Sequence, residues 1–284
     1  MAFIDEEQST QEGRPAFFLI FERDSKVWRY TNVDQDITLD SNVYTAIPFS
    51  VPDIFQSGDP RSEEMSFSLP SSAGISQYLD TRIPSTEVTV TLRKAHLIED
   101  ELTGEFTAPA IADAPVLWVG EIIELKRPQI NEREIVCNTL SLTMNRGGLR
   151  LSWGRNCPYV LYERGCLVNR ASFAVPLATV TVVDGITLSS ADADAQPDGW
   201  FSGGYIEWNS EPGVVERLGI ESHTGPLLTV LGLTTGVAGG SNYVAYPGCA
   251  RSADVCNTKF SNILNFGGVN HMTGKSPFDG SPVY

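Results

Sequence analysis

Four of the five cysteines form two pairs in the second half of the chain. Eight residues separate Cys157 from Cys166 and six separate Cys249 from Cys256, and both pairs stand in polar, loop-like sequence. Thiolates gathered in this way bind soft metal centres, and in oxidising compartments such cysteines form disulfides instead. The chemistry open to this chain therefore depends on what these four sulfur atoms hold.

The spacing of the pairs leaves three alternatives open. Zinc prefers two cysteines separated by two to four residues, so both loops are longer than the usual zinc knuckle. An iron–sulfur cluster tolerates wider spacing because each thiolate binds a separate iron atom. Disulfides or free thiols are the third alternative, but the N-terminus lacks the basic start and apolar stretch of a signal peptide, so we expect synthesis in the cytosol, where disulfides are rare.

No other pattern in the sequence indicates catalysis. The P-loop, H-E-x-x-H and G-x-S-x-G motifs are missing, and the three histidines, His96, His223 and His271, are scattered singly. Cys137 alternates with Ile135 and Thr139 in an apparent strand, which is typical of a small buried residue. We therefore predict that the chain is not an enzyme and has no catalytic residues.

The elements that must position the cysteines are mostly β-strands. Aromatic and β-branched residues alternate with polar ones over 16–55, 65–69, 87–93, 115–125, 135–144 and 175–188, between turns rich in Pro, Gly and Asp. Short helices are expected over 73–80 and 254–263. The acidic stretch 189–199 is predicted to be a solvated loop, since Pro197 stands where a calcium loop beginning at Asp192 needs glycine.

Length and charge limit the classes of protein further. A chain of 284 residues with 42% hydrophobic content is long enough for two or three compact units. We place a boundary near residue 150, and the segment between the two cysteine pairs has the composition of an inserted β-rich unit. The net charge of −15 argues against a surface that holds nucleic acid. The longest apolar runs, 17–21 and 227–233, are too short for a membrane span.

Three segments around the cysteines, and one nearer the N-terminus, carry a family resemblance. The chain reads GRNCPYVLYERGC at 154–166, GGYIEWNSEPG at 203–213, PGCARSADVCNTKFSNILNFGGVNHMTG at 247–274 and RYTNVDQDITLDSNVYTA at 29–46. These segments resemble the tail-tip (baseplate) hub proteins of long-tailed phages and gene transfer agents, to which minor tail protein L of lambda-like phages is related. The resemblance covers nearly the whole chain.

The resemblance implies a non-enzymatic virion protein at the tail tip, assembled in the host cytoplasm. Its expected form is a homotrimer between the hexameric distal tail protein and the trimeric central fibre or spike, near the tape measure protein. The genome would pass through its channel without specific binding, because an acidic wall repels DNA. The resemblance also implies an N-terminal hub region of one or two β-domains over 1–150.

For the C-terminal region 151–284, the resemblance implies an iron–sulfur domain that carries a small inserted β-barrel at 172–246. Its 4Fe–4S cluster would be bound by Cys157, Cys166, Cys249 and Cys256, with zinc as the less favoured occupant. The family's C-terminal signature, FxNxxNFxGFPxxPG, is kept from Phe260 to Gly268. The aromatic residue and both prolines that follow are replaced in this chain.

Two competing interpretations belong to other classes. The first is an exported, disulfide-bonded β-rich module that binds glycans or proteins through Trp200, Trp208, Tyr205 and Tyr243. We interpret these four aromatics instead as residues of a core or an interface. The second is a redox enzyme that uses a cluster, and it is disfavoured because no second cofactor motif accompanies the cysteines.

Overall fold

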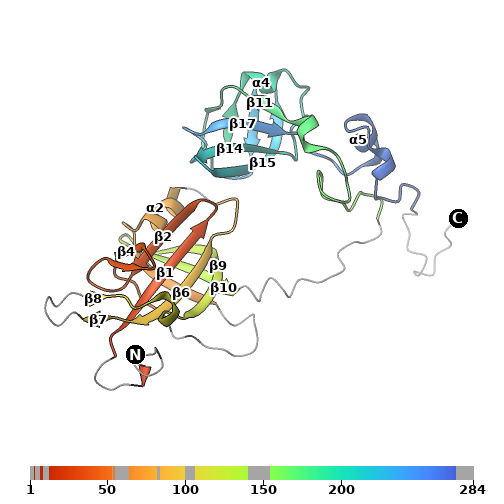
Figure 1. The fold of residues 1–284 in the computed structure, drawn as a ribbon. Coiled ribbons are helices and arrows are strands. Elements are labelled where there is room, and N and C mark those ends of the chain that lie inside the picture. Colours follow the sequence, from red (N-terminus) through yellow and green to blue (C-terminus); the bar gives the residue numbers. More distant parts are fainter. Residues whose placement is uncertain are drawn as a thin grey trace. The chain divides into compact units, whose positions relative to one another are not determined.

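The computed structural model describes residues 13–52, 64–81, 84–99, 106–139 and 154–272, together with residues 3, 7, 8 and 54. The chain divides into two compact units, Met1–Arg146 and Gly147–Tyr284 (Figure 1). Strands dominate both units, so the predicted mostly-β class is confirmed. Within the described ranges, each helix is too short or too polar to cross a membrane.

The first unit contains one eight-stranded sheet, ordered β3-β4-β2-β1-β6-β9-β10-β5. Neighbouring strands are antiparallel except β2 and β4, which run parallel. A separate two-stranded ladder joins β7 (Ile98–Glu99) to β8 (Phe106–Thr107). The strands of the large sheet are β1 (Pro15–Arg23), β2 (Lys26–Thr31), β3 (Ile37–Leu39), β4 (Asn42–Ala46), β5 (Met65–Pro70), β6 (Thr89–His96), β9 (Val116–Gln129) and β10 (Glu132–Thr139).

The main core of the first unit lies between this sheet and helix α2 (Gly74–Thr81). Alternate residues of β5 point inward, as the period of a strand requires. Phe67 is fully buried, and the centres of the Phe67 and Trp118 rings are 6.1 Å apart. From α2, Ile75 and Tyr78 bury their side chains in the same core. The helix predicted over 73–80 is therefore confirmed, and its apolar face explains why it forms.

The second unit holds a seven-stranded antiparallel sheet in the order β11-β17-β14-β15-β16-β13-β12. Leu177 near one end of this order and Leu188 near the other share one buried cluster, so the sheet curls around its core. The strands are β11 (Val175–Leu177), β12 (Thr181–Val182), β13 (Thr187–Ser189), β14 (Tyr205–Glu211), β15 (Val214–Thr224), β16 (Leu227–Val230) and β17 (Ser241–Tyr246). All of them lie between the two cysteine pairs in sequence.

Two local expectations in this unit were wrong. The strand predicted over 175–188 is three short strands, because the chain reverses where the Val183 amide donates to the Thr187 carbonyl. The acidic stretch 189–199 contains helix α4 (Ala191–Asp194). Its Ala193 is fully buried in the core of the sheet, so this segment is not simply a solvated loop.

One predicted helix ends earlier than expected, and one predicted strand runs beyond the described residues. The helix predicted over 254–263 is α5 (Ala253–Thr258), followed by a separate 3₁₀ turn, η3 (Ile263–Asn265). Between them Ser261 has a positive φ of 49°, which a continuing helix does not allow. Strand β10 is described to Thr139, and the remainder of the strand predicted to end at 144 lies outside the described residues.

Candidate functional site: a pocket lined by four cysteines

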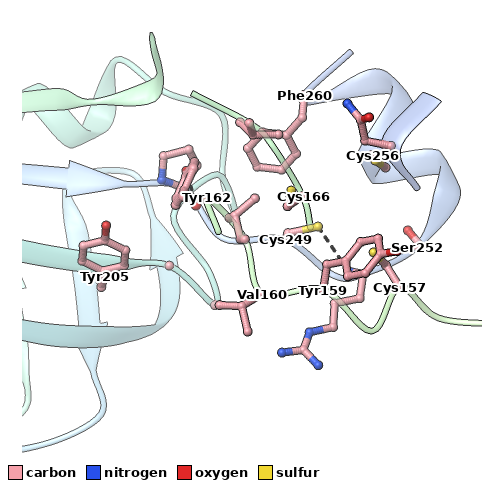
Figure 2. A pocket seen from close by; sticks show the side chains of 17 residues that line it. Cys157, Tyr159, Val160, Tyr162, Cys166, Tyr205, Cys249, Ser252, Cys256 and Phe260 are labelled. Carbon is pink, nitrogen blue, oxygen red and sulfur yellow. Dashed lines mark hydrogen bonds between the residues drawn. The ribbon is translucent and has the colours of Figure 1, made fainter. Parts of the chain in front are cut away.

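All four paired cysteines line one pocket of the second unit, with a volume of about 230 Å³. Figure 2 shows the four sulfur-bearing side chains gathered in one part of the pocket, with Tyr205 away from them at the other end. The remaining wall is mainly aromatic and aliphatic. It comprises Tyr159, Val160, Leu161, Tyr162, Val168, Gly203, Gly204, Tyr205, Pro247, Arg251, Ser252, Phe260 and Asn265.

Local hydrogen bonds bring the two cysteine segments together. The Cys157 amide donates to the Arg251 carbonyl at 2.8 Å, which joins the first segment to the second. Cys166 closes a turn through its amide and the Glu163 carbonyl at 3.0 Å. Cys256 lies in α5, whose N-terminus is capped by Ser252, since the hydroxyl accepts from the Val255 amide at 3.3 Å. The inserted sheet thus leaves and re-enters a single hydrogen-bonded unit.

The backbone of these segments adopts conformations that ordinary side chains avoid. Tyr162, Leu167 and Arg251 have φ values of 67°, 61° and 58°. For residues with large side chains this region costs about 1–2 kcal/mol each, whereas Asp and Asn occupy it readily in turns. The cysteine segments are therefore held in a shape that their local preferences do not favour.

Close approaches of neighbouring atoms explain three glycines of the cysteine region. A Cβ built on Gly165 or on Gly267 would lie 2.4 Å from the Tyr159 ring, so both segments close against this ring. A Cβ on Gly248 would lie 2.1 Å from the Ser202 carbonyl oxygen, where the inserted sheet meets the Cys249 loop. Glycine is required at these positions because the neighbouring atoms leave no space for a side chain.

Three of the sulfur atoms have polar neighbours. The Arg251 amide donates to Cys249 Sγ at 3.3 Å, and the side-chain amide of Asn262 lies 3.8 Å from Cys166 Sγ. In its thiol form Cys256 donates to the Asn262 carbonyl at 3.3 Å. Backbone and side-chain N–H groups of this kind stabilise negative charge on sulfur.

The sulfur atoms also affect one another electrostatically. Burial raises the pKa of the Cys256 thiol, and the neighbouring Cys249, Cys166 and Cys157 raise it further, because thiolates close together repel. A chain with net charge −15 nevertheless places mainly basic residues in 154–172 and 247–272. These are Arg155, Arg164, Arg170, Arg251 and Lys259, against Glu163 and Asp254. The two cysteine segments thus carry a net positive charge, in contrast to the chain as a whole.

Lys259 connects the cysteine region to the inserted sheet. Its ammonium group donates to the Trp200 carbonyl and to the Gly248 carbonyl, at 2.5 and 2.8 Å, and lies 4.6 Å from the centre of the Trp200 ring. Burial lowers the pKa of Lys259, while the sulfur of Cys249 acts in the opposite direction. The lysine therefore holds the loop that carries Cys249.

The cysteines exist as free thiols in this structure. None of the five, all of which lie in described residues, forms a disulfide. Cys137 is fully buried in the core of the first unit, which confirms its predicted role, and burial raises its pKa. Across the described ranges, no three His, Cys, Asp or Glu side chains are grouped as they would be around a single metal ion.

The remaining residues singled out in the sequence have structural surroundings. His223 is buried, with Nε2 2.9 Å from the Gly225 carbonyl oxygen, and His96 is buried with Nε2 2.8 Å from Glu7; His271 is exposed. Trp208 lies in the core of the inserted sheet, and Trp200 and Tyr243 pack against that core. Tyr205 stacks on Tyr246 with ring centres 4.9 Å apart. The four aromatics are core and packing residues, as predicted.

Sequence reasoning missed several residues that shape the pocket. No sequence motif predicts the contacts of Tyr159, Gly248 and Lys259, because each residue contacts a segment distant in sequence. Asn262 was visible only as a position of the C-terminal signature, without a role. A glycine directly before a cysteine, as at Gly248 and Gly165, is the one local signal that could have found part of this arrangement.

Comparison with known proteins gives similarities to a phage family and to a solved virion structure. A family described as "Phage conserved hypothetical protein BR0599" matches residues 199–276, a segment that contains Cys249 and Cys256. A chain of a solved structure titled "Virion of native gene transfer agent (GTA) particle" has a similar fold, with a TM-score of 0.72 and 19% sequence identity. The similarity covers 99% of this chain and 95% of that chain. The search of curated proteins gave no match.

Proposed function

We propose that this chain is a structural virion protein of a long-tailed phage or gene transfer agent, and that it is the hub of the tail tip. The observation that carries the proposal is the similarity of fold to a chain of a gene transfer agent virion along 99% of this chain. The match of residues 199–276 to a phage family supports the same class. Such a protein works by assembly rather than by catalysis.

The hub role implies specific partners for this chain. A homotrimer would join the hexameric distal tail protein to the trimeric central fibre or spike, with its β-domains presenting a quasi-sixfold face to the ring and a threefold face to the fibre. The tape measure protein would be its neighbour in the tail. A net charge of −15 suits a channel wall along which DNA slides without binding.

The proposal includes a 4Fe–4S cluster held by Cys157, Cys166, Cys249 and Cys256. These four thiols line one pocket from two segments that lie on either side of the inserted sheet. The pocket volume of about 230 Å³ far exceeds the ~10–15 Å³ that one water-sized body needs. N–H groups near Cys249 and Cys166 suit sulfur ligands that share a negative charge. These features support the proposal of a polynuclear cluster over one zinc ion.

The cluster would supply a crosslink in place of a hydrophobic core. Among the described residues, the buried apolar cluster of this region contains Cys166, Val168 and Phe260, with six partly buried residues packed against it. It is smaller than the core of the inserted sheet, which has eleven buried residues. Bonds from four thiolates to one inorganic centre would lower the entropy of the unfolded chain and hold both segments.

Anaerobic production of the chain tests the cofactor and the assembly together. We expect brown protein with four iron and four sulfide per chain, and a trimer by light scattering. Bound zinc without sulfide would contradict the cluster and support a zinc site instead. Colourless protein in which the four paired cysteines are oxidised and one thiol remains would instead support the exported disulfide-bonded module.

The tail-tip assignment needs a separate test. Particles assembled with the chain carrying a small epitope tag at its C-terminus are labelled with a gold-conjugated antibody. We expect gold at the tail tip, at up to three sites per particle. Label distributed along the tail or on the capsid contradicts the hub role but not a structural role in the virion.

A further inference from the structure

Asn262 contacts both cysteine pairs and has no assigned role. Its side-chain amide donates to the Cys166 carbonyl at 2.6 Å and lies 3.8 Å from Cys166 Sγ, so it reaches the first pair. Its backbone amide donates to the Cys256 carbonyl at 2.9 Å, which ties it to the second pair. Asn262 is thus hydrogen-bonded to two of the four proposed ligands from opposite sides of the inserted sheet in sequence.

The orientation of the Asn262 amide is itself determined by a neighbour. Asn265 Nδ2 donates to Asn262 Oδ1 at 2.7 Å, which leaves the Nδ2 hydrogens of Asn262 directed to Cys166. The preceding residue, Ser261, has a φ of 49°, so the chain turns sharply at this point. Both asparagines are half-buried, and their hydrogen bonds are therefore partly shielded from competition with water.

We propose that Asn262 is a positioning residue of the four-cysteine centre, oriented by Asn265, and that its amide sets the placement and charge of Cys166 sulfur. The inference rests on the proposed function, since it concerns the same centre. Groups that hydrogen-bond to metal ligands fix the geometry of those ligands, and their loss typically weakens metal retention about 10- to 100-fold. Hydrogen bonds to the sulfur atoms of a cluster also make it easier to reduce.

The variant Asn262→Asp removes the amide donor but keeps the side-chain shape and the acceptor for Asn265. Asn257→Asp is the matched control, because Asn257 is exposed in α5 beside Cys256 and receives the same new charge. After anaerobic reconstitution with iron and sulfide, we expect Asn262→Asp to lose iron to a chelator roughly 10- to 100-fold faster than wild type. Its reduction potential should also fall below those of wild type and Asn257→Asp.

A measurement without iron separates the two proposals. In the iron-free chain, alkylation of Cys166 by iodoacetamide, followed by peptide mass spectrometry, should be slower in Asn262→Asp than in Asn257→Asp, because the new carboxylate lies beside the sulfur and repels negative charge on it. Asn265→Ala should show the same changes in smaller degree, and it decides the matter if Asn262→Asp fails to fold. A wild-type chain that binds no iron overturns the cluster, and the alkylation measurement still tests whether Asn262 positions Cys166. Equal iron loss, potential and alkylation in Asn262→Asp and Asn257→Asp overturn the role of Asn262.

Discussion

The sheet of the first unit and the cysteine region of the second are stabilised in different ways. The main core of the first unit contains sixteen buried apolar residues contributed by six strands, by helix α2 and by the residues that flank them. The corresponding cluster beside the cysteines contains three, of which Cys166 is one. The comparison teaches that a large apolar core holds the first region, whereas the second combines a small apolar cluster with hydrogen bonds between its two segments.

The largest expected effect is the removal of the sulfur ligands from the cysteine region. In Cys166→Ser/Cys249→Ser, the four-thiolate set is lost, so we expect loss of all bound iron and of amide protection in the cysteine segments 154–172 and 247–272. The melting of the first unit should be unchanged, as followed by amide hydrogen exchange resolved by peptide. Cys137→Ser is the matched control and should retain the iron. Full protection of residues 154–172 in the double variant would refute this dependence.

A cavity in the first unit should produce the opposite pattern. Phe67→Ala removes a fully buried ring, and we expect a loss of about 3–5 kcal/mol in the free energy of unfolding of this unit. Iron content should not change. Urea denaturation followed by circular dichroism gives the value, with Val43→Ala as a control, since Val43 is 59% exposed. An equal effect of the two variants would contradict the core described here.

The joint between the inserted sheet and the Cys249 loop should be sensitive to one added methyl group. In Gly248→Ala the new Cβ meets the Ser202 carbonyl at 2.1 Å, so the backbone must shift, at a cost of about 1–3 kcal/mol. We expect a lower melting temperature of the second unit and faster release of iron. Gly154→Ala, where no atom lies near the new Cβ, serves as the control. Identical melting of these two variants would argue against the close approach.

The smallest effect concerns an ion-pair group of the first unit. Burial raises the pKa of Asp80, but hydrogen bonds from Arg127 and Arg133 outweigh it, and the pKa of the folded state is lowered. The carboxylate therefore stabilises the fold above its unfolded pKa of about 3.9, and this contribution is lost as pH falls through the folded value. Asp80→Asn should cost roughly 1 kcal/mol at pH 7 and less at pH 2. Denaturation at both pH values measures it, and an equal loss at both would exclude the ionic cause.

The sequence predicted the fold class because strand alternation is a local property. Met65, Phe67 and Leu69 alternate with serines, and their inward positions follow from the period of two. The prediction of a solvated loop over 189–199 failed because it depended on a contact between segments distant in sequence. Ala193 in α4 is buried only because the sheet curls over it, and nothing in an acidic, alanine-rich stretch indicates that contact.

The sequence identified the four cysteines of the candidate site but not the residues that shape the pocket around them. Cys157, Cys166, Cys249 and Cys256 were identified by residue type, since a thiol carries its chemistry wherever it lies, although their binding of a cluster stays a prediction. Tyr159, Lys259 and Asn262 contribute through contacts with distant segments. Such contacts exist only after folding.

By itself, the sequence determined the mostly-β class, the acidic charge and the pairing of cysteines along the chain. The tertiary structure alone decided that both pairs reach one pocket, that Gly248 meets Ser202, and that the Asn262 amide is aimed at Cys166. The physical reason is the separation in sequence over which each kind of interaction acts. Periodicity and residue chemistry act between neighbours in sequence, whereas convergence across an inserted sheet depends on how its core closes.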